Sequence, residues 1–179
     1  IFQDILGQRI SEAVPNLRLA NRGLTLARKS GRPLLFVFHN QKNNRRGLQD
    51  WMKHYTRNPY TPALRTLLSE FVVIMMPIRE MPALSQIVGQ PPYTAPSTAR
   101  PLFVVARSNG EQLDAVAGWD SDRCLVDALA RGCVRVMKEQ PPSLSRMRRA
   151  VRSLKKINRN LADEVRQLAK KTLEARRAA

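Results

Sequence analysis

Residues 34–38 read LLFVF, and this stretch decides the fold because an unbroken apolar run is typical of a strand buried on both faces. Residues 17–29 before it have helical spacing. The sequence SGRP at 30–33 ends that helix with the glycine and proline that commonly follow a helix C-terminus. A doubly buried strand preceded by a helix predicts a sheet packed between helices.

Further strands are expected on the C-terminal side of this run. Residues 71–76 (FVVIMM) and 102–106 (LFVVA) are apolar runs of the same kind, and a fourth strand is expected over 113–118. Between the last two strands, Asn109-Gly110 predicts a tight hairpin with positive φ at both central positions. Helices are expected over 48–55, 62–70 with Thr61 as N-cap, 83–88, and from residue 120 or 121 to 138. The first two strands then need a parallel crossover and the last two are antiparallel, which gives a mixed α/β sheet.

The chain is strongly basic, and the charge is uneven. Its 179 residues hold 31 Lys and Arg against 14 Asp and Glu, a net charge of +17, and residues 143–179 alone hold 12 basic and 3 acidic residues. This balance favours nucleic acid, an acidic membrane surface or an acidic protein as partner. No run approaches ~18 consecutive apolar residues, so no transmembrane helix is expected. The first residue is Ile1, which leaves a removed signal peptide open and the compartment undetermined.

Paired prolines divide the chain. Pro141-Pro142 cannot continue a helix, and the basic excess begins directly after them. We therefore expect an N-terminal extension over 1–14, a body over 15–140 and a basic helical arm over 141–179. The body is expected to have a core of its own and to stay folded without the arm.

The body resembles the thioredoxin family in the order and spacing of several short motifs. These are ARKSGRPLLFVF at 27–38, Asn58-Pro59 ahead of the second strand, Arg100-Pro101 ahead of the third, and Asn109-Gly110 followed by Gly118. The resemblance implies a thioredoxin-like mixed sheet flanked by helices, to which this chain adds a long C-terminal amphipathic helix. It also implies a cis bond before Pro101 and a peptide-binding groove beside it.

The redox motif of that family is missing here. Residues 39–47 read HNQKNNRRG, without the two cysteines, and thiol–disulfide exchange needs a thiolate and a second thiol. The chain is therefore expected to be redox-inactive, not an enzyme, and without a cofactor. The vestigial groove remains a candidate basic surface for an acidic segment or a phosphate, or else a solvated loop. Its residues would be Asn43, Asn44, Gly47, Arg100 and Pro101.

No other chemistry is indicated by the remaining reactive residues. Cys124 and Cys133 lie nine residues apart on one expected helix, on opposite faces and about 13 Å apart along its axis, so they cannot form a disulfide there. The two histidines, His39 and His54, have no metal-site or nucleophile pattern around them. No metal site and no phosphate-binding loop is expected.

The arm carries a heptad pattern. With Leu144 at position a, apolar residues recur at a and d over about four heptads, with Asn158 at one a position as a register device for a parallel dimer. The expected interface residues of this coiled coil are Met147, Val151, Leu154, Asn158, Leu161, Val165 and Leu168. The same stripe could instead dock on the body or on a larger partner. On the outer face, the candidate phosphate contacts are Arg148, Arg149, Arg152, Lys155 and Lys156.

Three functions stay open. The first is a non-catalytic thioredoxin-like binding or scaffolding subunit of a larger assembly, whose arm binds a protein partner or a second copy of the chain. The second is an RNA- or ribosome-associated protein whose arm contacts phosphates, without base stacking because the arm has no aromatic residue. The third is an enzyme with an unrecognised site.

Overall fold

A computed structural model describes residues 16–39, 61–94, 102–117 and 122–178 of the chain. Its centre is a four-stranded sheet in the order β2-β1-β3-β4. Strand β1 (Leu34–His39) pairs in parallel with β2 (Val72–Pro77) and antiparallel with β3 (Leu102–Ala106), which pairs antiparallel with β4 (Gln112–Ala117). The predicted mixed α/β sheet is confirmed.

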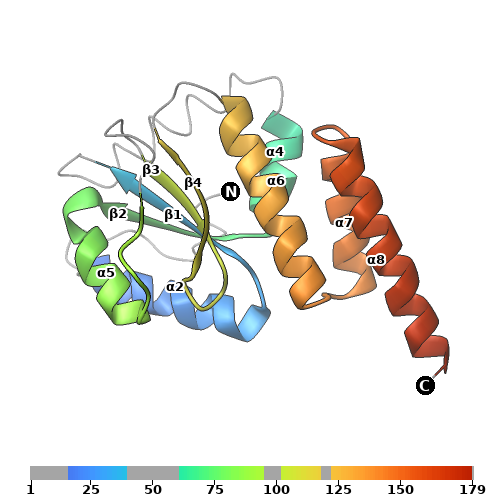
Figure 1. Ribbon diagram of the computed structural model, residues 1–179, viewed down its shortest axis with the longest axis horizontal. Coiled ribbons are helices and arrows are strands. Elements are labelled where there is room, and N and C mark those ends of the chain that lie inside the picture. Colours follow the sequence, from blue (N-terminus) through green and yellow to red (C-terminus); the bar gives the residue numbers. More distant parts are fainter. Residues whose placement is uncertain (1–15, 40–60, 95–101, 118–121, 179) are drawn as a thin grey trace.

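The helices form three layers around this sheet (Figure 1). One face is covered by α2 (Asn16–Ser30) and α5 (Met81–Val88), which follows the short 3₁₀ helix η1 (Ile78–Glu80). The opposite face is covered by α4 (Thr61–Leu68) and α6 (Asp122–Glu139). Outside them lie the last two helices, α7 (Leu144–Leu154) and α8 (Arg159–Ala178). The order is therefore helices, sheet, helices and an outer helical hairpin.

The strands are buried on both faces, as their apolar runs predict. On β1, Leu34, Phe36 and Phe38 belong to the core under α2 and α5. Leu35 and Val37 point to the other face and join the core under α4 and α6. Side chains alternate between the faces of a strand, so an unbroken apolar run supplies both cores at once.

The hairpin between β3 and β4 differs from its prediction. Gly110 has a φ of 91°, but no residue other than glycine has a positive φ in the described ranges, so the prediction of positive φ at Asn109 is wrong. The amide of Gly110 donates to the carbonyl of Arg107 at 2.9 Å, and the Asn109 side chain accepts from the amide of Glu111 at 3.0 Å. The strand register shifts between Val105 and Ala106. The turn therefore uses one left-handed residue, Gly110, rather than two.

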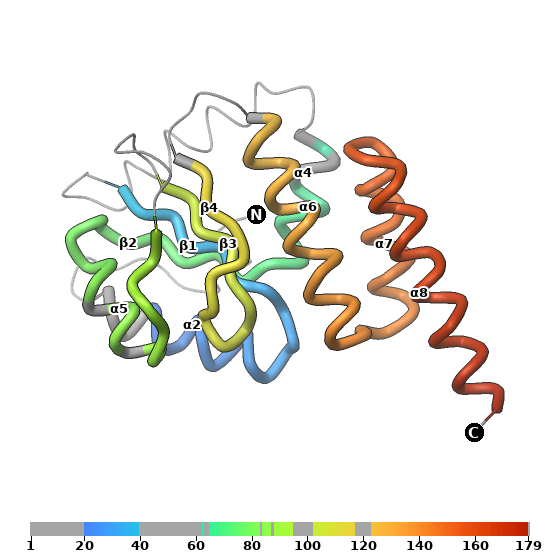
Figure 2. The backbone as a smooth tube through the Cα atoms, viewed as in Figure 1, coloured from blue at the N-terminus to red at the C-terminus, as the bar shows by residue number. Residues whose placement is uncertain are grey.

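The arm is two helices, and the expectation of one long helix is wrong. After α7 the chain turns over residues 155–158, and α8 runs back antiparallel to α7 (Figure 2). Asn158 caps α8, since its side-chain oxygen accepts from the amide of Leu161 at 3.2 Å. A capping asparagine satisfies an amide that has no partner inside the helix, which favours a helix start at this point. Within this chain Asn158 therefore acts as a cap.

The arm and the body share one of the two cores, the one under α4 and α6. Ser143 caps α7 directly after the two prolines, so the chain does change direction at the expected boundary. Met147 and Leu154 of α7 and Val165 of α8 are nevertheless fully buried in the same cluster as Cys133 of α6. The expectation of a body with a separate core is wrong for one face of the sheet, because α4 and α6 pack between that face and the α7–α8 hairpin. The core under α2 and α5 contains no described residue of the arm.

A close contact between α6 and β3 gives a first prediction. A Cβ at Gly132 would lie 2.4 Å from Cγ1 of Val105, a stiff, fully buried side chain on a central strand. Gly132→Ala should therefore lower the free energy of unfolding by about 1–3 kcal/mol in urea denaturation, although alanine is the better helix former. The same substitution in a Val105→Ala background should be much less harmful. An equal cost in both backgrounds would contradict the steric explanation.

Candidate anion-binding groove

The expected vestigial groove lies outside the described residues. Its candidate residues Asn43, Asn44, Gly47, Arg100 and Pro101 all lie outside the described residues, as do the expected helix over 48–55 and the bond before Pro101. The heptad residues, by contrast, are all described. Their side chains have partners within the chain: Met147, Leu154 and Val165 are fully buried, and Val151, Leu161 and Leu168 pack half-buried against the same core.

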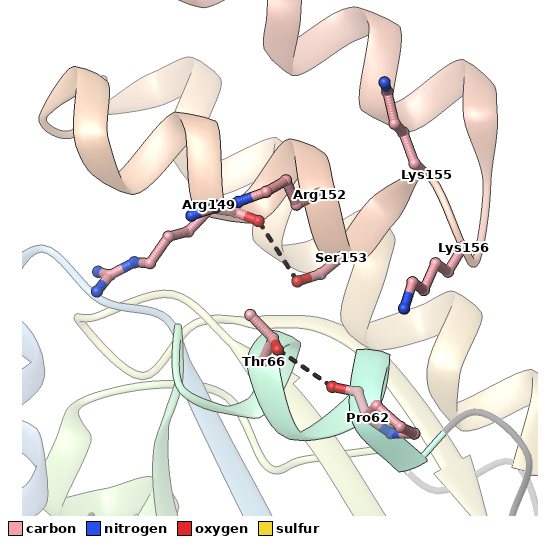
Figure 3. A pocket seen from close by; sticks show the side chains of 7 residues that line it. All are labelled: Pro62, Thr66, Arg149, Arg152, Ser153, Lys155 and Lys156. Carbon is pink, nitrogen blue, oxygen red and sulfur yellow. Dashed lines mark hydrogen bonds between the residues drawn. The ribbon is translucent and has the colours of Figure 1, made fainter.

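The predicted phosphate contacts come together at a groove between α4 and α7 (Figure 3). The groove has a volume of about 570 Å³. One wall is Pro62 and Thr66 of α4, and the other is Arg149, Arg152 and Ser153 of α7 with Lys155 and Lys156 of the following turn. Four of the five candidate residues therefore line it, while Arg148 is exposed on α7 and is not part of the lining.

Helical spacing places these cations. Arg149 and Arg152 are three residues apart and Lys156 follows four residues later, so the three return to a similar side of α7 and its last turn. Met147 and Leu154 occupy the side that packs on the core. In Figure 3 the Lys156 side chain reaches toward Pro62, whereas Lys155 points away from α4. The groove therefore has cations along its length and a neutral wall opposite.

Among the described residues, three of the four cations of the groove have no carboxylate close by. Several basic side chains on the β3–β4 hairpin, α6 and α8 are paired with Asp or Glu, whereas Arg159, Lys171, Arg176 and Arg177 of α8 are not paired within the described ranges. The paired residues are Arg107, Arg123, Arg131, Arg135, Lys138, Arg166 and Lys170. In the described part of the chain, Arg152, Lys155 and Lys156 form no ion pair, and only Arg149 approaches a carboxylate, at 3.9 Å from Glu70. The groove therefore brings three cations without an ion pair, and Arg149, to one site.

A buried charged cluster holds α7 beside α4. Glu70, directly after α4, is only 1% exposed and forms an ion pair with the guanidinium of Arg146. Arg146 also donates to the Glu70 carbonyl at 3.4 Å. Next to it, Arg32 donates to the carbonyls of Ser69, at 2.6 Å, and Phe71. Burial lowers the pKa of Arg32, and the nearby charge of Arg146 lowers it further while Glu70 opposes the shift. We call Arg32, Glu70, Arg146 and Arg149 the Glu70 cluster.

Sequence reasoning missed the Glu70 cluster. Glu70 and Arg146 are 76 residues apart, and each has an ordinary surface pattern in its own segment. The missed residue matters for the site, because Glu70 contacts Arg149 of the groove as well as Arg146 of the anchor. The only local signal was that a glutamate directly precedes an apolar strand.

The buried thiol of Cys133 is poorly suited to nucleophilic chemistry. Cys133 is buried, and burial raises the pKa of its thiol to about 12, helped by the negative charge of Glu70. At neutral pH its thiolate is therefore negligible. Cys124 is exposed nine residues earlier on α6. Within the described ranges, no three His, Cys, Asp or Glu residues are grouped as metal ligands.

We predict that the chain does not catalyse disulfide exchange. Residues 39–47 contain no cysteine, and the two thiols present are one exposed and one buried group. Insulin reduction with dithiothreitol should therefore proceed at the rate without protein. A Cys124→Ser, Cys133→Ser variant serves as control. Turnover above background that persists in this variant would contradict the prediction.

Comparisons with protein-family models, with curated proteins and with solved structures found no match for the chain. In the ranges that the structure describes, no helix is long and apolar enough to span a membrane.

Proposed function

We propose that this chain is a non-catalytic binding protein on a thioredoxin-like fold, and that its groove between α4 and α7 binds the phosphate backbone of nucleic acid. The observation that carries the proposal is a set of four cations lining one groove, three of them without an ion-pair partner in the described residues. Nucleic acid binding depends above all on such unneutralised Lys and Arg side chains.

The thioredoxin-like assignment is supported by the order of elements. The motif resemblance implies a helix, a strand, a crossover helix to a parallel strand, an antiparallel hairpin and a final helix. The described elements α2, β1, α4, β2, β3, β4 and α6 follow that order, with α5 inserted before β3. The missing cysteines in residues 39–47 support a binding role over a redox role.

Burial of the heptad residues favours phosphate binding over dimerisation through the arm. A coiled coil would use Leu154 and Val165, and both are already fully buried against the body. Dimerisation along this stripe would first have to separate the α7–α8 hairpin from α4 and α6. This separation would expose the apolar surface that is buried between them, which costs free energy. The cations on the outer side of α7 need no such rearrangement.

The lining of the groove favours nucleic acid over an acidic protein. Protein interfaces usually depend on aromatic or aliphatic anchors at their centre. The described lining has no aromatic residue, and Leu26 on α2 is the one large apolar side chain that is strongly exposed in the described ranges. Phosphate contacts need only cations, and they carry no base specificity.

A charge-removal variant tests the proposal. Replacing Arg149, Arg152, Lys155 and Lys156 by Gln should weaken RNA binding more than 10-fold at about 0.1 M salt, and should lower the slope of log affinity against log salt by up to about 3. Fluorescence anisotropy over a salt series measures both quantities. The matched control removes four charges from exposed positions on α8, by replacing Arg159, Lys171, Arg176 and Arg177 with Gln.

The control separates a site from a general effect of charge. We expect the α8 variant to keep most of the affinity, because its cations lie outside the groove. Equal losses in both variants would contradict the assignment of the groove. Tight binding of polyglutamate with no binding of RNA would instead support an acidic protein partner.

A further inference from the structure

We propose that the Arg149 end of the groove is a subsite for one phosphate group, which supplies the negative charge that the Glu70 cluster lacks. This inference rests on the proposed function and deepens it, because it names the contact that anchors a backbone phosphate in that site. It follows from the charge balance of the cluster, from the bonds that its two buried arginines already form, and from the exposure of Arg149.

The Glu70 cluster has more positive than negative charge. It holds three guanidinium groups, those of Arg32, Arg146 and Arg149, and one carboxylate. In the part of the chain that the structure describes, no second carboxylate forms an ion pair with these arginines. Burial lowers the pKa of Arg32, the charge of Arg146 lowers it further, Glu70 opposes the shift, and the charge of Arg149 adds to it. The three arginines therefore repel one another around a single counter-charge.

The two buried arginines are held by the protein itself. Arg146 donates to the Glu70 carboxylate, to the Glu70 carbonyl at 3.4 Å and to the Ser30 carbonyl at 3.5 Å. Arg32 donates to the carbonyl of Ser69 at 2.6 Å. Carbonyl groups satisfy N–H donors but carry no full negative charge, so the surplus positive charge of the cluster remains. A ligand that offsets this surplus has to bind through the third arginine.

Arg149 is the member of the cluster that a ligand can reach. Its side chain is 57% exposed and lines the groove. Its Nε atom lies 3.9 Å from Oε1 of Glu70, which is longer than a hydrogen bond, and this buried oxygen has no hydrogen-bond partner among the described residues. Arg149 is therefore attracted to the cluster without donating to it. Its guanidinium stays free to donate two parallel N–H groups to a phosphate.

The position of Arg149 sets this subsite apart from the rest of the groove. In Figure 3 its side chain extends away from Lys155 and Lys156. The lysines present single point charges, whereas an arginine forms a two-pronged contact with phosphate oxygens. We therefore expect the lysines to attract a polyanion along the groove and Arg149 to fix one of its phosphates. A phosphate bound there also offsets the surplus charge of the Glu70 cluster, so its binding should stabilise the folded chain.

The first test measures this stabilisation with inorganic phosphate. The full chain is unfolded in urea in about 20 mM phosphate and in chloride of equal ionic strength, as wild type, as Arg149→Gln and as the matched control Arg148→Gln. Arg148 is the neighbouring exposed arginine of α7 and does not line the groove. Phosphate should lower the unfolding constant of wild type and control at least about 3-fold more than that of Arg149→Gln. Each variant is compared with itself in chloride, so a general salt effect or a change in its own stability cancels.

The second test asks whether nucleic acid uses the same subsite. Fluorescence anisotropy measures binding of a labelled oligouridylate of about 12 nucleotides to the same three proteins. Arg149→Gln should lose at least about 5-fold in affinity, since it removes charge-assisted hydrogen bonds, and Arg148→Gln should lose under about 2-fold. An equal loss in the two variants would overturn the inference, because the groove would then attract RNA by its general charge.

Failure of the subsite and failure of the proposed function give different results. Equal stabilisation by phosphate in all three proteins, or no stabilisation in any, would overturn the inference. The proposed function then still stands or falls on the RNA affinity of the variant that lacks four charges. Stabilisation that requires Arg149, with no binding of RNA to the wild type, would support the subsite as a site for a small phosphate compound and would overturn the proposed function.

Discussion

Replacing Leu154, Leu161 and Leu168 together by alanine should lower the free energy of unfolding of the whole domain by more than about 5 kcal/mol. Leu154 is 0% exposed, and truncation of a fully buried leucine costs about 2–5 kcal/mol. Leu161 and Leu168 are half-buried against the same core and add smaller losses. A domain of this size has only about 5–15 kcal/mol of stability, so the variant should be largely unfolded at 37 °C.

The form of the unfolding transition tests the shared core. We expect a single transition in urea, followed by far-UV circular dichroism, with its midpoint shifted strongly down. Leu26→Ala is the matched control, because that leucine is 45% exposed on α2 and should cost well under about 1 kcal/mol. A triple variant that loses the signal of α7 and α8 while the sheet keeps its wild-type midpoint would show that arm and body have separate cores.

Replacing Glu70 by alanine should lower the free energy of unfolding by about 3–5 kcal/mol. The Arg146 side chain is only 14% exposed, and removal of its carboxylate leaves a guanidinium buried without a counter-charge, beside that of Arg32. The loss of stability should appear as a lower urea midpoint, while the slope of the free energy of unfolding against urea concentration stays unchanged. Glu111→Ala is the matched control, because Glu111 pairs with Arg107 at the surface, where an ion pair contributes about 0–1 kcal/mol.

A double variant separates the unpaired charge from general disruption. Glu70→Leu with Arg146→Met replaces both charges by apolar groups of similar size, and should recover most of the stability lost in Glu70→Ala. No recovery in the double variant would mean that the destabilisation comes from lost packing and not from an unpaired guanidinium.

The strands were predictable because their signal is local. Apolar runs at 34–38, 71–76 and 102–106 place β1, β2 and β3 within one residue of their observed bounds. The hairpin was placed correctly, but its turn has a positive φ at Gly110 alone. The register shift between Val105 and Ala106 was not predicted, because it depends on the pairing of two strands. A local sequence pattern predicts which strands pair better than it predicts the dihedral angles of the connection between them.

The arm shows where a repeating pattern is ambiguous. Apolar residues at the a and d positions are compatible with one long helix or with two helices that both face the same core. Asn158 fits either arrangement, as a polar residue in a coiled-coil seam or as a helix cap, and its bond to the amide of Leu161 selects the cap. The two-helix arrangement depends on α4 and α6, because these helices supply the apolar surface that the a and d residues cover.

The cations of the groove could be predicted from the sequence, but its opposite wall could not. Its cations could be named from the sequence because charge on the outer side of an amphipathic helix is visible there. The wall formed by Pro62 and Thr66, and the contact of Arg149 with Glu70, depend on pairing between segments about 80 residues apart. No local pattern encodes that distance, so the cations were predicted and the groove was not.

The outer helical hairpin has a consequence for synthesis. Met147, Leu154 and Val165 complete the core over α4 and α6, yet they are made after every strand of the described sheet. A nascent chain that has reached only residue 140 therefore exposes the apolar sides of α4 and α6 to solvent. Chains usually fold from the N-terminus as they emerge, and exposed apolar surface at that stage promotes aggregation. The core over α4 and α6 is therefore completed only after α7 and α8 have been translated.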